Sequence, residues 1–511
     1  MYAGGCFFGL STLICFFIIK RAPMLCVRQF ILLGRSLMRT KYLTLNLLCG
    51  SLLGLLSFVF PWLILIWALV AAILWLLNRF SPPEHKRFLV ALFITGLTVR
   101  IILACALHAI SYGTHALRPS AKYTNPGETV LMGDAAGYSA YGWLLTQYWQ
   151  GDRSVFSEDK QVALGKYFFT AQTYLAAFFY LIFGYYPLLP ALFNSLIGSL
   201  IAIFVFLIAR EYLDEETARI SSFLTMFWPS ILFWSLGNTR EPISILSLVV
   251  TIWSVLGLYR IPKPHYFAIA GISLWVFYNY QQSLFIFLAA WIALVLFIKV
   301  FSVKLLRRFL LLLLIFGIGT AFATPKITVW ANKATSTAVA MVDGIVSRNL
   351  GAYFTGGSTY KIYPERLYDL GIYRQGKFFN HLNLFDWAVT IGKGFVYFFF
   401  LPFPLFIRSN IQLLCLPETL FWYALFPFFA LGLLLSLRYF FKKTFMISLL
   451  LVPLTLVYSL TEANMGTAFR HKSLIFTLYL IFASFAIRKF FLRGNNIKQN
   501  TEKGAFNNGQ V

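Results

Sequence analysis

The chain has 511 residues, of which 59% are hydrophobic and only 12% are charged, and its net charge is +25. A soluble domain carries about twice this charged fraction, and the apolar runs here approach the length of about 20 residues that crosses a bilayer as a helix. The composition therefore excludes a soluble helical protein, and the lack of apolar–polar alternation excludes a soluble β-protein. The location of the basic residues, between apolar runs, argues against a nucleic-acid partner.

Residues 1–87 are predicted to form the N-terminal membrane segments. The apolar stretch 5–19 is followed by basic residues, so it is either a first span or an over-extended start, since Met24 and Met38 can also begin the chain. A cleaved signal peptide fits less well, because its basic residues would precede the apolar stretch. Residues 43–77 are apolar around Pro61 and are predicted to form a hairpin of two spans.

Residues 88–325 are predicted to form the transmembrane core. A span at 88–110 leads into a first outer loop, 111–187, in which the aromatic stretch 167–184 is interpreted as an interfacial helix. The remaining spans of the core are predicted at 188–209, 220–236, 243–258, 266–280, 283–298 and 309–325.

A second polar region, 326–418, is predicted to be a large extracytoplasmic loop with an interfacial stretch at 387–401. The C-terminal helices, within 419–487, are predicted at 419–437, 444–460 and 473–487, and 488–511 form a basic cytoplasmic tail. The predicted fold is thus an all-α polytopic membrane protein of about 12 or 13 transmembrane helices. Its two large extracytoplasmic loops carry interfacial helices.

The charge distribution agrees with this topology. The segments placed in the cytoplasm have a Lys and Arg density about three times that of the external segments, as the positive-inside rule requires. The cytoplasmic links are short and contain no GxxxxGK[ST] or GxGxxG pattern. A nucleotide-dependent reaction is therefore not expected, and chemistry is predicted on the outer face, with reactants that arrive through the lipid. The six cysteines form no CxxC pair and are interpreted as thiols packed in the membrane.

The first outer loop contains the pattern D-x-x-x-Y, which places Asp134 and Tyr138 one helical turn apart on one face. A carboxylate at the membrane surface can accept a proton from a hydroxyl group. The same position also fits an ordinary helix cap, and spacing alone leaves both interpretations open.

Further motifs follow this pattern in a fixed order. They are Tyr174–Ala177 with Leu181–Gly184, Leu192–Gly198, Ala209-Arg210, Ala218-Arg219 and Trp228-Pro229. Together with D-x-x-x-Y, this stretch of roughly 88–300 resembles the membrane glycosyltransferases of the GT-C fold, such as protein O-mannosyltransferases and lipid A aminoarabinose transferases. The resemblance implies a GT-C-like bundle that moves a sugar from a polyprenyl-phosphate donor to a glycan, lipid or protein acceptor. It also implies a multi-pass protein of the bacterial cytoplasmic membrane whose active site faces outside.

The resemblance also implies roles for individual residues. Asp134 would deprotonate or orient the acceptor hydroxyl, and Tyr138 would bind substrate. Glu241 occupies a second acidic position in an outer turn, with Arg240 beside it, where it would bind a divalent metal or help to position the donor phosphate. No metal-ligand set is identified, so the cofactor stays unknown. The alternative is a structural Arg–Glu pair at a helix start, with Pro242 in the first turn.

The last outer turn ends in Arg470, His471 and Lys472, which are predicted to bind the carrier phosphate. These residues also fit simple anchoring of the next span at the interface. Arg100 lies inside a span, where it either pairs within the bundle or reaches the interface. The acidic residues and histidine of the second loop have no metal-ligand spacing; they are Asp343, Glu365, Asp369, His381 and Asp386.

Two other functions remain open at this point. An O-antigen polymerase or ligase would use the same class of lipid-linked saccharide but rely more on arginine and histidine. A transporter or flippase of lipid-linked saccharides would not be an enzyme. It would show internal repeats and charged or broken helices near the membrane centre.

Overall fold

The computed structural model describes residues 54–117, 132–156, 170–300, 360–363, 383–407 and 410–491. These residues are mostly helical and contain no β-strand. Eight of the described helices are long and apolar enough to cross a membrane. The prediction of an all-α polytopic membrane protein is confirmed. The predicted span at 309–325, most of the second loop, the apolar stretch 5–19 and most of the tail 488–511 lie outside the described residues.

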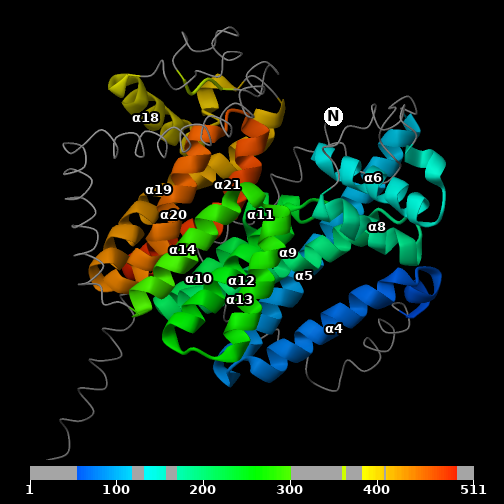
Figure 1. Ribbon diagram of the computed structural model, residues 1–511, viewed down its shortest axis with the longest axis horizontal. Helices are drawn as coiled ribbons and strands as arrows, with labels where there is room; N and C mark the ends of the chain where they lie inside the picture. Colours follow the sequence, from blue (N-terminus) through cyan, green and yellow to red (C-terminus); the bar gives the residue numbers. More distant parts are fainter. Residues whose placement is uncertain are drawn as a thin grey trace, which may run out of the picture.

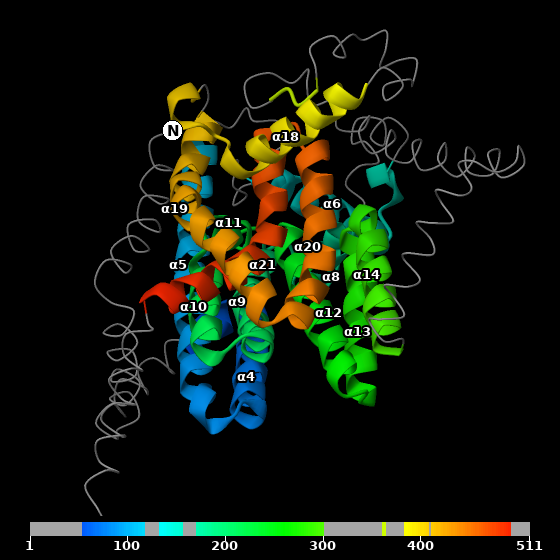
Figure 2. The same ribbon diagram turned by 90° about the vertical axis from the view of Figure 1, so that its left-hand side faces the viewer.

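The bundle consists mainly of long helices that run back and forth between its two ends (Figures 1 and 2). The eight long apolar helices are α4 (Trp62–Phe80), α5 (Pro83–Leu117), α9 (Leu188–Tyr212), α12 (Glu241–Arg260), α14 (Gln282–Val300), α19 (Asn410–Tyr439), α20 (Phe441–Thr461) and α21 (Met465–Phe491). The slightly shorter α13 (Pro264–Tyr280) joins α12 to α14. Prolines stand in the first turn of α12 and α13, where no intrahelical donor is lost.

Three shorter helices lie at one end of the bundle, where the long helices α12 and α21 begin (Figures 1 and 2). They are α6 (Gly133–Trp149), α8 (Ala171–Phe183) and α18 (Leu384–Phe400). Two of them correspond to the predicted interfacial stretches 167–184 and 387–401. In α18, the N-cap residue Asn383 and Asp386 form a capping box, in which the Asp386 carboxylate accepts a hydrogen bond from the Asn383 backbone amide.

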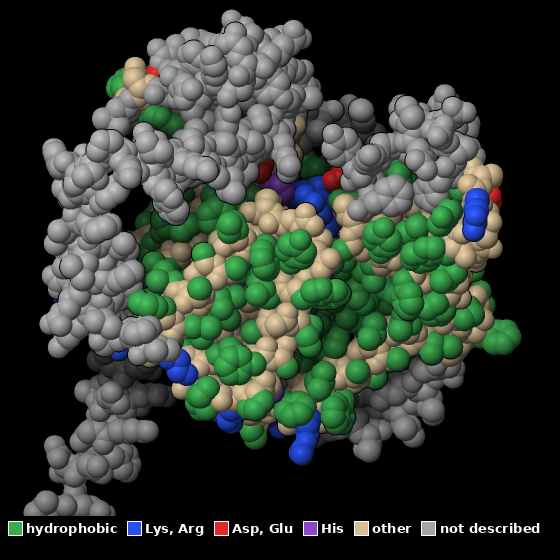
Figure 3. All heavy atoms as spheres, in the orientation of Figure 1, with side chains coloured by type: hydrophobic (Ala, Val, Ile, Leu, Met, Phe, Trp, Pro, Cys, Tyr) green, Lys and Arg blue, Asp and Glu red, His purple; other side chains and the backbone are tan. Residues whose placement is uncertain are grey.

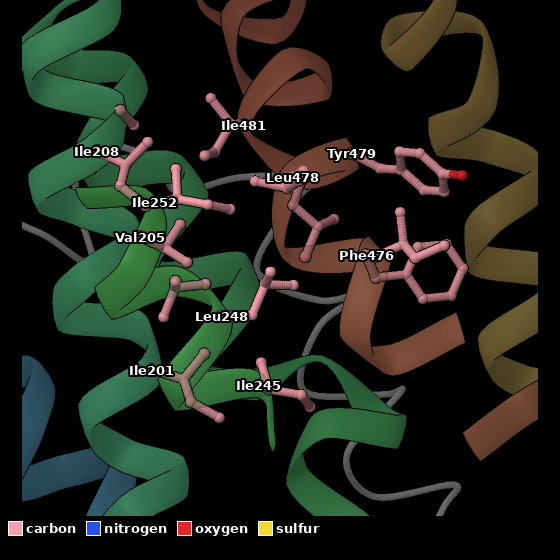
Figure 4. Close-up of a cluster of buried hydrophobic side chains, with 14 of the residues drawn as sticks. Ile201, Val205, Ile208, Ile245, Leu248, Ile252, Phe476, Leu478, Tyr479 and Ile481 are labelled. Atoms are coloured by element: carbon pink, nitrogen blue, oxygen red, sulfur yellow. The ribbon is translucent and has the colours of Figure 1, made fainter. Parts of the chain in front are cut away.

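The core of the bundle lies where α9, α12 and α21 meet. Ile201, Val205 and Ile208 of α9 face Ile245, Leu248 and Ile252 of α12, with apolar side chains of α21 beside them (Figure 4). In each of these three helices 72% of the most apolar stretch is buried, whereas the value for α4 is 11%. Lipid tails are as apolar as these side chains, so the tight interdigitation of branched residues provides the attraction between the helices.

The distribution of charged residues distinguishes the two ends of the bundle. The last turns of α4, α9, α12, α14, α19 and α21 contain basic residues, and these are Arg79, Arg210, Arg260, Lys299, Arg438, Arg488 and Lys489. Ion pairs link neighbouring helices at this end: Arg488 of α21 lies 3.1 Å from Glu216 of α10 (Glu215–Phe227), and Arg260 of α12 lies 3.4 Å from Glu211 of α9. We call it the basic end, and we call the end with α6, α8 and α18 the site end. Between them, the visible surface is largely hydrophobic (Figure 3).

One predicted span, 220–236, is broken. Its residues form α10 (Glu215–Phe227) and α11 (Pro229–Trp234), separated at Trp228 because Pro229 cannot donate the next backbone hydrogen bond. Such a break leaves free carbonyls on one side and free amides on the other, and each needs a partner away from water. Arg100 Nη2 donates to the Met226 carbonyl (2.8 Å), and the Ser230 amide donates to Glu418 Oε2 (2.6 Å).

Arg100 therefore pairs within the bundle, where it is completely buried. Its Nε also donates to Ser235 Oγ (3.0 Å), so one side chain contacts the end of α10 and the residue after α11. The alternative that Arg100 extends to the interface is not what the structure shows.

Candidate functional site

Arg470 joins two carboxylates that lie far apart in the sequence. Its Nη1 donates to Asp134 Oδ2, and its Nε donates to Glu241 Oε1. Arg240 lies beside them, with its Nε 3.6 Å from Glu241 Oε1. Tyr138 is buried near enough for the charges of all four residues to act on its hydroxyl. We call these five residues the carboxylate–arginine cluster.

The cluster forms because three helices begin at the site end. Asp134 lies in the first turn of α6, Glu241 is the first residue of α12, and Arg470 lies near the start of α21. The free amides of a helix start carry partial positive charge, which favours the two carboxylates and disfavours the arginine. Pairing Arg470 with both carboxylates offsets that disadvantage. Figure 3 shows acidic, basic and histidine side chains next to one another in the upper part of the described surface.

A polar network holds the turn that leads into Glu241. Asn194 Nδ2 donates to the carbonyls of Gly237 and Thr239, both at 2.7 Å. Asn238 Nδ2 donates to Ser139 Oγ (2.8 Å), and Gln172 Nε2 donates to Asn238 Oδ1 (2.5 Å). The turn is therefore tied to α9, α6 and α8 together. These bonds fix the position of Asp134 on α6 relative to Glu241 on α12.

Helix α6 itself packs closely against α8. A Cβ atom added at Gly142 would lie only 2.9 Å from the Ala176 Cβ and 3.3 Å from the Thr173 carbonyl oxygen. One turn later, Thr146 Oγ1 donates to the Ala177 carbonyl (3.0 Å). The small side chains allow the backbones of α6 and α8 to come close together. This close contact fixes the position and direction of α6 relative to α8.

Burial differs across the cluster. The side chain of Glu241 is 3% exposed and that of Arg470 is 12% exposed, whereas the side chain of Asp134 is 49% exposed. Burial raises the pKa of Tyr138, although the nearby cations Arg470 and Arg240 act in the opposite direction. Tyr138 therefore remains a neutral hydroxyl that can donate one hydrogen bond and accept another.

The cluster retains unused hydrogen-bonding capacity. Arg470 Nη2 and Glu241 Oε2 are buried and have no hydrogen-bond partner among the described residues. Buried polar atoms normally have partners, so an unpaired donor and an unpaired acceptor in one cluster indicate room for a ligand. The free guanidinium nitrogen is suited to an anionic oxygen, because arginine binds phosphate and carboxylate groups strongly.

The two residues after Arg470 bind partners other than Asp134 and Glu241. His471 Nδ1 lies 2.6 Å from Glu462 Oε1, and the imidazole stacks on the Tyr458 ring with 5.1 Å between centroids. Lys472 Nζ donates to the Leu401 carbonyl (3.4 Å) and lies over the Phe398 ring. The structure thus brings Arg470, but not Lys472, to the two carboxylates. The expected phosphate site of three adjacent cations is not assembled as one group.

A metal is not favoured by the arrangement around Glu241. The described residues include no group of three His, Cys, Asp or Glu side chains that could hold a metal ion. Arg470 lies between Asp134 and Glu241, so an ion bridging these carboxylates would have to displace the guanidinium. The loop residues Asp343, Glu365, Asp369 and His381 lie outside the described residues.

Sequence reasoning did not single out Glu418, Tyr458 or the pairing role of Glu462. Glu418 and Glu462 are almost completely buried, at the broken helix and beside His471 respectively. The available signal was the presence of a carboxylate within or directly after an apolar run, because such a group is costly in a membrane unless it has a partner.

Compared with models of known protein families and with curated proteins, the chain matches none.

Proposed function

We propose that this chain is a membrane glycosyltransferase that transfers a sugar from a polyprenyl-phosphate-linked donor to a glycan, lipid or protein acceptor. The observation that carries the proposal is the joining of Asp134 and Glu241 by Arg470 at the site end of the bundle. The sequence resemblance to GT-C enzymes points to the same residues. A lipid-linked donor fits a cluster that lies at the end of apolar helices.

The roles that we propose for the residues of the cluster follow from how deeply each side chain is buried. Glu241 is buried and holds Arg470 in place, while the unpaired Nη2 of Arg470 and the neighbouring Arg240 bind the donor phosphate. Asp134 is half exposed and accepts a hydrogen bond from the acceptor hydroxyl, which it orients toward the sugar. Tyr138 donates or accepts a hydrogen bond at the same place. Positive charge at the phosphate stabilises the leaving group as it develops.

The proposed orientation rests on the two ends of the bundle. The basic end would face the cytoplasm, as the positive-inside rule requires, and the site end would then face outward. A bacterial cytoplasmic membrane is the proposed location, since the related enzymes of the resemblance act there. The donor would reach the cluster from within the lipid.

The test is the variant Asp134→Asn in a transfer assay with a panel of polyprenyl-phosphate sugars. We expect a loss of about 10²-fold or more in kcat, because the asparagine amide lacks the negative charge of the carboxylate. The amide oxygen can still accept a hydrogen bond, so the variant tests the charge itself. Asp152→Asn, an exposed aspartate just after α6, is the matched control and should transfer at the wild-type rate. Full activity of Asp134→Asn would remove Asp134 from the mechanism.

One observation favours a second candidate, a transporter of lipid-linked saccharides. The break at Trp228-Pro229 and the buried charges Arg100 and Glu418 are features that transporters use near the membrane centre. Here, however, these charges satisfy backbone groups that the break itself exposes. Movement of a fluorescent polyprenyl-phosphate sugar across reconstituted vesicles, without any glycosylated product, would favour the transporter.

A further inference from the structure

A second acid–base pair lies beside the carboxylate–arginine cluster. Glu462 follows the last residue of α20, and His471 lies in the second turn of α21. Their side chains are only 5% and 15% exposed, and His471 Nδ1 lies 2.6 Å from Glu462 Oε1. A carboxylate accepts the hydrogen bond at Nδ1, so the neutral form of this imidazole carries its proton on Nδ1. The lone pair is then on Nε2.

The imidazole is held in one orientation. It stacks on the Tyr458 ring with an interplanar angle of 24°, and its Nδ1 is bound to the carboxylate of Glu462. These two contacts together fix the orientation of the ring. Nε2 makes no hydrogen bond with any described residue. A carboxylate that orients an imidazole and leaves its second nitrogen free is the arrangement that proton-transfer sites require.

The pair is continuous with the proposed site. His471 directly follows Arg470, and Tyr458 lies near enough for the charges of Glu462, Arg240, Glu241 and Arg470 to act on its hydroxyl. That hydroxyl is buried and has no hydrogen-bond partner among the described residues. Tyr458 is therefore close to both groups of charged residues.

We propose that His471 is the general base of the transfer reaction and that Glu462 is its positioning residue. This inference rests on the proposed function. Nε2 of His471 takes the proton from the acceptor hydroxyl as its oxygen forms a bond to the anomeric carbon. The bond from that carbon to the phosphate oxygen breaks, and its electron pair leaves with the polyprenyl phosphate. Glu462 stabilises the imidazolium, which then loses its proton to water.

This assignment gives Asp134 and His471 separate tasks. The ion pair to Arg470 fixes the position of the Asp134 carboxylate, which orients the acceptor, whereas His471 removes the proton. It also differs from the role that the sequence predicted for His471, which was binding of the carrier phosphate by a cation. Removal of a general base lowers kcat, whereas removal of a phosphate-binding residue raises KM for the donor.

The experiment measures kcat and KM for polyprenyl-phosphate sugars with His471→Ala, Glu462→Gln and Glu462→Asp. We expect His471→Ala to lower kcat by about 10²-fold or more with little change in donor KM. Added imidazole should restore part of the rate in proportion to its concentration, which a structural defect would not allow. Glu462→Gln should lower kcat similarly, and Glu462→Asp should recover part of it. His265→Ala, at the start of α13, is the matched control.

The outcomes separate the two proposals. Wild-type protein that transfers no sugar contradicts the proposed function, whereas active wild-type protein with fully active His471→Ala contradicts only the role of His471. A variant impaired in KM alone, without imidazole rescue, would make His471 a phosphate ligand instead.

A second measurement does not depend on turnover. Diethyl pyrocarbonate modifies free imidazole nitrogens, and mass spectrometry locates the product. We expect His471 to be modified in the full-length protein and shielded by added polyprenyl phosphate. Modification of His265 without any modification of His471 would show that Nε2 is not available, and it would overturn the proposal.

Discussion

Arg470 is the residue on which the charge balance of the site depends. It pairs with one carboxylate that is almost completely buried, Glu241, and with one that is half exposed, Asp134. A buried carboxylate without a partner is strongly unfavourable, because the surroundings screen its charge poorly. An exposed one is hydrated and gains little from the same partner. The two carboxylates should therefore respond very differently when their ion pairs are broken.

We predict that Arg470→Gln destabilises the folded protein by about 2–3 kcal/mol, because Glu241 loses its hydrogen-bonded cation and keeps only Arg240, whose Nε lies 3.6 Å away. Asp134→Asn should cost at most about 1 kcal/mol, since Asp134 is half exposed. Thermal unfolding of the purified variants in detergent measures both changes. Equal unfolding temperatures for the wild type and Arg470→Gln would contradict the account of burial.

The sequence singled out all five members of the cluster but misplaced the two residues that follow Arg470. Asp134, Tyr138, Arg240, Glu241 and Arg470 all lie in short polar stretches beside apolar runs, so their meeting at one end follows from the topology. His471 and Lys472 were assigned to a turn before a span at 473–487. In the structure α21 already begins at Met465, and successive residues of a helix point about 100° apart. Adjacent cations therefore face different neighbours.

At the scale of elements, the broken helix α10–α11 positions the turn that carries Arg240 and Glu241. Arg100 contacts one side of the break, and Glu418 contacts the other. The sequence contains the cause of the break, Trp228-Pro229, but 220–236 was predicted as one continuous span. Its partners are separated from it by more than a hundred residues, and no local pattern reveals that pairing.

We predict that Glu418→Leu lowers stability by about 1–3 kcal/mol, because the Ser230 amide loses its acceptor in a region without water. Glu418→Gln keeps an acceptor oxygen and should be less harmful. The unfolding midpoint in detergent is the measurement. Adding Lys472→Met to Glu418→Leu should recover part of the loss, since it removes the cation that Glu418 faces. A Glu418→Leu variant as stable as the wild type would show that Glu418 does not support the break.

The contact between α6 and α8 gives another prediction at this scale. In Gly142→Ala, the added methyl group would lie 2.9 Å from the Ala176 Cβ, so α6 must shift away from α8. A displacement of about 1 Å at a catalytic group can cost about 10²-fold in rate, so we expect a loss of transfer activity of that order. Gly271→Ala, where the added methyl group meets nothing within 4 Å, is the control. Equal activity of both variants would contradict the role of this contact.

For the whole molecule, the strongest sequence signal is the basic end. The predicted cytoplasmic links and the basic last turns of the helices coincide, because hydropathy and clustered Lys and Arg mark this end of a membrane helix. The sequence therefore predicted the path of the chain through the bundle better than the contacts between its helices. Those contacts depend on side-chain shape and on polar pairs that are distant along the chain.

This charge asymmetry predicts the orientation in the membrane. In a cysteine-free background, Ser154→Cys at the site end should react with a membrane-impermeant maleimide added to intact cells. Lys263→Cys at the basic end should react only after the membrane is opened. Both residues are exposed, so accessibility differs only by side of the membrane. Labelling of Lys263→Cys in intact cells would reverse the orientation.

The most direct test of the central claim is a transfer assay with the purified full-length protein in lipid vesicles. The donors are polyprenyl-phosphate-linked sugars, the acceptors are glycans, lipids and peptides, and mass spectrometry detects the products. We predict a glycosylated acceptor and free polyprenyl phosphate in equal amounts, with no need for a nucleotide. Asp134→Asn should form both products about 10²-fold or more slowly, while remaining folded. Absence of both products for every donor, with wild-type protein that is folded and binds polyprenyl phosphate, would contradict the proposed glycosyl transfer.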